Sequence, residues 1–120
     1  METALLKKNN GTYSPVKMKG DEAWIIADFL ISDVGAFAFY YKEWALGQEL
    51  VTGGNATFLK KENACVIMTH DFIATEVEVK IPVASFVSML DEWVAISQKK
   101  YATIELQWDG KEIEFRMANI

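Results

Sequence analysis

Residues 77–117 read VEVKIPVASFVSMLDEWVAISQKKYATIELQWDGKEIEFRM and contain the elements that decide the fold class. Apolar and charged side chains alternate over residues 77–81, which predicts a strand with one face in solvent. Pro82 then opens a run in which apolar residues recur every three or four positions, as on one face of an α-helix. The stretch ends in two alternating runs joined by Asp109-Gly110, a dipeptide typical of a tight β-hairpin. A strand, a helix and a hairpin in this order predict an α+β domain.

The sequence before residue 77 supplies further strands. Short runs on either side of Asn9-Asn10-Gly11 predict a first hairpin, and Pro15 places its second strand at a sheet edge. Residues 56–61 and 64–69 predict two more strands, the second covered on both faces because it is apolar at both parities. We therefore expect one domain, residues 1–120, in which an antiparallel β-sheet has helices packed mainly on one face.

Two helices are expected between the first hairpin and these strands. Residues 24–30 fit helical spacing over about two turns. A helix over residues 33–46, with Asp33 as its N-cap, has one continuous apolar stripe. The stripe consists of Val34, Phe37, Ala38, Tyr41, Trp44 and Ala45. Phe39, Tyr40 and Leu46 lie off this stripe, so we expect this helix to be buried on more than one side.

A two-residue loop at Asp109-Gly110 would fix the register of the last hairpin. Counting outward from that loop sets Leu106 opposite Ile113, which gives the hairpin one apolar face. The same register sets Glu105 opposite Glu114, and two like charges in this position destabilise a hairpin slightly.

The net charge excludes two classes of partner, and the cysteine content and N-terminus indicate the compartment. The 17 acidic residues outnumber the 12 basic ones, giving a net charge of −5. Nucleic acid and anionic membranes recruit Lys and Arg, so neither is expected as a partner. Cys65 is the only cysteine and cannot form an internal disulfide, and the N-terminus does not resemble a signal peptide. The cytoplasm is therefore the expected compartment.

No set of residues in the sequence predicts catalysis. Cys65 and His70 are the only candidates for a nucleophile and an imidazole base, and a spacing of five along a strand points them to opposite faces. One Cys and one His cannot build a zinc site without several carboxylates. We therefore expect no enzymatic activity, no cofactor and no metal, with an enzyme that depends on Cys65 as a weaker alternative.

The distribution of charge suggests a surface for a basic protein. Residues 71–120 carry nine acidic and five basic side chains. Their carboxylates predict an acidic patch on the solvent face of the sheet, unless Lys80 and Arg116 neutralise it. The loop 71–76 between two strands either folds back on the core or contacts a partner. The candidate partner-binding residues are Glu78, Glu105, Glu112, Glu114, Asp71, Phe72 and Ile73.

Several segments resemble the small acidic immunity proteins of bacterial contact-dependent growth inhibition and related polymorphic toxin systems. They are Ile26-Ala-Asp-Phe-Leu30, Asp33-Val-Gly35, Glu43-Trp-Ala-Leu46, Ile81-Pro-Val-Ala-Ser-Phe86 and Leu90-Asp-Glu-Trp93, within residues 24–95. The resemblance implies a protein without catalytic residues that binds and neutralises the C-terminal domain of a toxin, often a nuclease. The alternative is a small-ligand-binding or accessory domain with a cavity under the aromatic helix 34–46. Binding to a basic protein weakens at high salt, whereas binding in a cavity barely changes.

Overall fold

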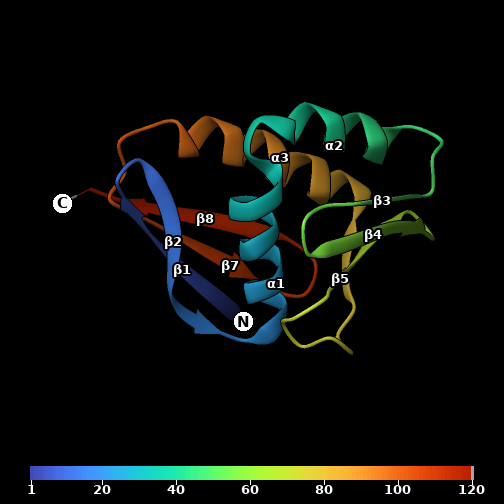
Figure 1. Ribbon diagram of the computed structural model, residues 1–120, viewed down its shortest axis with the longest axis horizontal. Coiled ribbons are helices and arrows are strands. Elements are labelled where there is room, and N and C mark those ends of the chain that lie inside the picture. Colours follow the sequence, from blue (N-terminus) through green and yellow to red (C-terminus); the bar gives the residue numbers. More distant parts are fainter. Residues whose placement is uncertain (120) are drawn as a thin grey trace.

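The strands pair into two antiparallel sheets rather than one (Figure 1). The computed structural model describes residues 1–119. The first sheet has the order β2-β1-β7-β8 and the second the order β3-β4-β5-β6. The first contains β1 (Glu2–Asn9), β2 (Thr12–Lys19), β7 (Thr103–Trp108) and β8 (Ile113–Ala118). The second contains β3 (Val51–Gly53), β4 (Thr57–Glu62), β5 (Cys65–His70) and β6 (Val79–Pro82). The predicted α+β class is confirmed, and β2 is an edge strand as expected.

The helical part of the chain changes direction at Gly35. Helix α1 (Asp21–Phe29) continues into a π-helical turn, Leu30–Val34, and a short 3₁₀ turn then leads into α2 (Ala38–Leu46). Gly35 has a φ of 35°, in the region that favours glycine, and α1 and α2 run in different directions (Figure 1). The single helix predicted over 33–46 is therefore wrong in its first turns, and Asp33 is not an N-cap.

By length and composition alone, the helical stretch Asp21–Leu46 could cross a membrane. In the structure this stretch bends at Gly35, and Ile25, Ile26 and Phe29 are fully buried. The α1 part therefore packs as a core helix of the domain.

Two helices hold the sheets together. Helix α1 packs on β1, β2 and β7 of the first sheet and also reaches β5 and β6 of the second. Helix α3 (Val83–Ser97) contacts α2, β8 and the second sheet. Trp44 and Trp93, on α2 and α3, are each only 5% exposed, as expected from the apolar helical stripes that begin at Val34 and after Pro82. The indole of Trp93 packs against the rings of Tyr13 and Phe115, with centroids 5.9 Å apart in each pair.

The register of the last hairpin differs from the prediction by two residues. Glu105 lies opposite Arg116, so the predicted like-charge pair with Glu114 does not form. The loop spans residues 109–112, because the Asp109 carboxylate accepts the backbone N–H groups three and two residues further on, at 2.7 and 2.9 Å. These hydrogen bonds also lower the pKa of the Asp109 carboxyl. A shift of two positions keeps every side chain on its predicted face, which is why the apolar pattern alone could not reveal it.

Candidate functional site

The predicted acidic residues do not form one patch. Glu105 and Glu114 lie on the first sheet, and Glu112 lies in the hairpin loop. Glu78 precedes β6 of the second sheet, where its carboxylate is 4.0 Å from the ammonium group of Lys60. These four residues therefore cannot act together as the single docking face expected from the sequence.

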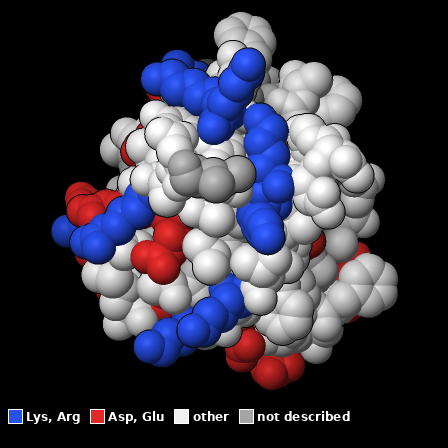
Figure 2. Space-filling model, turned by 90° about the vertical axis from the view of Figure 1, so that its left-hand side faces the viewer, with Lys and Arg blue, Asp and Glu red and all other residues white. Residues whose placement is uncertain are grey.

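Charge is divided along the long axis of the molecule. Residues 1–19 and 99–120, which hold the first sheet, carry eight basic and five acidic side chains. Residues 20–98 carry twelve acidic and only four basic side chains. Figure 2 shows Lys and Arg gathered on the end of the molecule that lies on the left in Figure 1. The net negative charge thus belongs to the helices and the second sheet, and residues 99–120 are neutral as a group, with four acidic and four basic side chains.

The loop that follows β5 is held in place by His70. The Nε2 of this buried imidazole lies 2.7 Å from the Asp28 carboxylate, and its Nδ1 accepts the backbone N–H groups of Phe72 and Ile73 at 3.0 Å. The ring proton therefore lies on Nε2. Phe72 is 79% exposed, whereas Ile73 is half-buried against the core. Ile73 therefore folds back on the core, and contact with a partner stays a prediction for Phe72. Asp71 is exposed.

The structure does not bring Cys65 and His70 together. Cys65 is half-buried at the first residue of β5, and His70 is the last residue of the same strand. Both ring nitrogens of His70 are engaged with the Asp28 carboxylate and the backbone. In the described part of the chain, no three His, Cys, Asp or Glu residues are grouped as a metal site requires.

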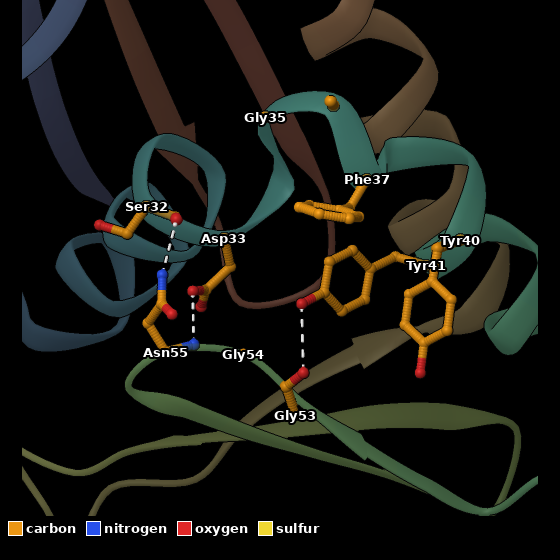
Figure 3. Close-up of a pocket in the computed structure, with 10 residues that line it drawn as sticks. Ser32, Asp33, Gly35, Phe37, Tyr40, Tyr41, Gly53, Gly54 and Asn55 are labelled. Carbon is orange, nitrogen blue, oxygen red and sulfur yellow. Dashed lines mark hydrogen bonds between the residues drawn. The ribbon is translucent and has the colours of Figure 1, made fainter.

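A cleft opens beside the bend between α1 and α2. We call this cleft of about 460 Å³ the aromatic cleft (Figure 3). Its lining residues are Ser32, Asp33, Gly35, Ala36, Phe37, Tyr40, Tyr41, Gly53, Gly54 and Asn55. The rings of Phe37, Tyr40 and Tyr41 stand on one side, and Asp33 and Asn55 lie on the other (Figure 3). Two segments that are distant in the sequence, the bend at residue 35 and the β3–β4 turn, therefore build one site.

Asp33 joins these two segments. Its carboxylate accepts the backbone N–H of Asn55 at 2.7 Å and the hydroxyl of Thr57 at 2.6 Å. Gly54 permits this approach, because a Cβ on it would lie 2.3 Å from the Asp33 carboxyl carbon. The side chain that the sequence assigned to a helix cap instead fixes the β3–β4 turn.

The aromatic wall combines a buried tyrosine with two exposed rings. Tyr41 is buried and donates a hydrogen bond to the carbonyl of Gly53 at 3.3 Å. Burial raises the pKa of the Tyr41 hydroxyl, and the nearby charges of Asp33 and Tyr40 raise it further. Phe37 and Tyr40 are 64% and 49% exposed. The cleft thus has a carboxylate at its inner side and rings that remain accessible from solvent.

A second hollow adjoins the aromatic cleft and shares Tyr40 with it. We call it the acidic hollow; its lining residues are Tyr40, Glu43, Trp44, Gly47, Gln48 and Glu49. The ammonium group of Lys61 lies on its flank, where it donates to the carbonyls of Trp44 and Gly47. Among residues 1–119, no Lys or Arg lines either hollow, whereas Asp33, Glu43 and Glu49 do. The two hollows together form a surface with exposed rings and three carboxylates.

The sequence pattern predicted that the aromatic rings of residues 33–46 are buried in the core. Phe37 falls on the apolar stripe, and the off-stripe residues Phe39, Tyr40 and Leu46 were expected to be covered on a second side. All four are exposed, because the bend at Gly35 takes α2 over the edge of the domain and only one side of it meets the core. The signal was present in the sequence, since large apolar residues off a helix stripe are also typical of a binding surface.

Comparisons of the chain with protein-family models, with curated proteins and with solved structures found no match.

Proposed function

We propose that this chain is an immunity-type protein that neutralises a toxin domain by binding it directly, without catalysis. The observation that carries the proposal is the pair of adjoining hollows, whose lining within residues 1–119 has exposed aromatic rings, three carboxylates and no Lys or Arg, with one ammonium group, that of Lys61, on the flank of the acidic hollow. Exposed aromatic side chains supply much of the binding energy at protein interfaces. The carboxylates select a partner of opposite charge. The partner is therefore a basic protein.

The distribution of charge over the whole molecule supports the same partner. The part of the chain that builds both hollows, residues 20–98, has twelve acidic and four basic side chains. Such an excess attracts a basic domain over distances comparable with the Debye length and raises the association rate. The resemblance to immunity proteins implies that this domain is the C-terminal region of a toxin, often a nuclease. The cytoplasm is the compartment we propose.

The test uses a basic toxin domain encoded next to this chain. Binding is measured by stopped-flow association and by surface plasmon resonance, and neutralisation is measured as loss of toxin activity. The variant Glu43→Gln/Glu49→Gln removes two exposed charges from the acidic hollow. Its matched control, Glu105→Gln/Glu114→Gln, removes two charges from the first sheet and retests the surface predicted from the sequence.

We expect the first double variant to slow association several-fold and the control to have a much smaller effect. The difference should shrink when NaCl rises from about 0.05 M to about 0.5 M, because salt screens exposed charges. Equal effects of the two variants would refute the assignment of this surface. A larger effect of the control would return the interface to the first sheet. A toxin domain that is neither bound nor neutralised would refute the proposed function.

The aromatic cleft also favours a second candidate, a small-ligand-binding domain. Its volume of about 460 Å³ lies within the range of ordinary ligand sites. In this case a small molecule would bind with an affinity that barely depends on salt, and the Glu43→Gln/Glu49→Gln variant would bind it normally.

A further inference from the structure

We infer that the aromatic cleft is a binding site for a guanidinium group, and that it receives an arginine side chain of the protein partner. The inference rests on the proposed function for the source of the arginine. The chemistry of the site stands on the structure of the cleft itself.

The charge of the Asp33 carboxylate has no counter-charge in the described part of the chain. This carboxylate is only 6% exposed, and among the described residues it forms no ion pair. Its two hydrogen-bond donors, the Asn55 N–H and the Thr57 hydroxyl, are both neutral. Each carboxylate oxygen can accept a second hydrogen bond. Burial of a charge without a partner of opposite sign is unfavourable, so a cation that enters the cleft gains a strong interaction.

The opposite wall of the cleft is aromatic. The rings of Phe37 and Tyr40 line the cleft and are 64% and 49% exposed, and the Tyr40 hydroxyl lies 2.6 Å from the Thr52 hydroxyl oxygen. In Figure 3 the rings of Phe37 and Tyr41 stand on the side opposite Asp33, with Tyr40 beyond Tyr41. A guanidinium is planar, stacks on aromatic faces and donates several hydrogen bonds in its own plane. It can therefore contact a ring and the carboxylate at the same time. A lysine ammonium has no flat face with which to stack on the rings.

Other ligand classes fit the cleft less well. Among the lining residues that the structure describes, Asp33 is the only carboxylate, which is too few oxygen ligands of this kind for a metal ion that prefers several. Within residues 1–119, no Lys, Arg or His lines the cleft to receive a phosphate or a carboxylate. Glu43 and Glu49 in the acidic hollow repel anions and attract cations to the same side of the molecule.

The experiment titrates the intact protein with N-acetyl-arginine amide and follows backbone amide shifts by NMR. N-acetyl-citrulline amide has the same shape without the charge, and N-acetyl-lysine amide has the charge without the plane. We expect saturable shifts at Phe37, Tyr40 and Asn55 with the arginine probe. The lysine probe should bind several-fold more weakly, and the citrulline probe should give no saturable shifts.

Variants then place the probe in the cleft. Tyr40→Ala and Phe37→Ala change exposed side chains and should each weaken binding of the arginine probe about fivefold. Asp33→Asn should weaken it about tenfold or more, and the two ring variants keep the test valid if Asp33→Asn fails to fold. Phe39→Ala is the matched control. The ring of Phe39 is 72% exposed and lies on α2, the helix that carries Tyr40, but it does not line the cleft.

The outcomes separate this inference from the proposed function. Absence of saturable shifts, equal binding of the citrulline probe, or binding that survives both ring variants would overturn the guanidinium site. If the arginine probe binds in the cleft but the protein binds no toxin domain in the separate binding assay, the guanidinium site is supported and the proposed function is refuted. If Tyr40→Ala and Phe37→Ala each bind the toxin domain as tightly as the parent protein does, the function is supported and the inference is overturned.

Discussion

Replacement of Gly54 by alanine tests how closely the β3–β4 turn meets the Asp33 carboxylate. Gly54 is not in the left-handed region, so alanine brings no backbone strain. At a site with free space, Gly→Ala stabilises a protein by about 0.4–1 kcal/mol through the unfolded state. Here the new Cβ would lie 2.3 Å from the Asp33 carboxyl carbon, whereas ordinary contact begins at 3.4 Å. The turn must therefore move by roughly 1 Å, which is enough to break the 2.7 Å hydrogen bond from the Asn55 N–H.

The magnitude follows from what that movement breaks. A hydrogen bond to a charged group contributes about 1.5–3 kcal/mol, and overpacking costs about 1–3 kcal/mol. The turn relieves the clash either by breaking the hydrogen bond or by staying overpacked, so the two energies are not added. We therefore expect Gly54→Ala to lower the free energy of unfolding by about 2–3 kcal/mol. The neighbouring control is Gly53→Ala, whose Cβ would lie 3.2 Å from a single carbonyl oxygen, that of Thr57. We expect a loss of less than about 1 kcal/mol there.

Urea denaturation followed by tryptophan fluorescence measures both losses. A double-mutant cycle then isolates the contact, because Asp33→Ala removes the atoms that a Cβ on Gly54 would meet. In the Asp33→Ala background, Gly54→Ala should cost almost nothing. If Gly54→Ala is as stable as the parent, or if Gly54→Ala lowers the free energy of unfolding by the same amount in the Asp33→Ala background, the cleft is not built as described.

Three further predictions concern Trp93 in the core, Glu92 on α3 and Cys65. Trp93→Ala should lower the free energy of unfolding by about 3–5 kcal/mol, as measured by urea denaturation, because it removes a buried ring from the core; a loss below about 1 kcal/mol would contradict the packing of α3. Partial burial of the Glu92 carboxyl, and then the charge of Glu114, raise the pKa of this group above its ordinary 4.5, so the folded state holds the carboxyl proton more tightly than the unfolded state does. Stability contributed by Glu92 is therefore complete below pH 4.5 and is lost as the pH rises through the raised pKa; Glu92→Gln should remove that loss and be the more stable protein at neutral pH, and a pH profile identical to the parent's would refute this. Cys65→Ser should leave toxin neutralisation intact, and its abolition in a folded variant would favour a thiol-dependent activity instead.

The local elements of this fold could be predicted from the sequence. The alternation over residues 77–81, the helical stripe after Pro82 and the turn signal at Asn10-Gly11 each reflect how a single segment buries one of its own faces. Burial of Trp44 and Trp93 followed from the same patterns. Such periodicities are contained within one segment, so the α+β class and most strand positions could be predicted without a structure.

Only the tertiary structure decided which segments meet. β1 pairs with β7 across about a hundred residues of sequence, and nothing in the pattern of either strand identifies the other as its partner. The candidate site depends on the same kind of long-range information. The bend at Gly35 exposes Phe37 and Tyr40, and the carboxylate of Asp33 meets a turn more than twenty residues away. A hydrophobic pattern specifies that a face is buried but not what covers it, so both the division into two sheets and the aromatic cleft emerge only when the segments pack together.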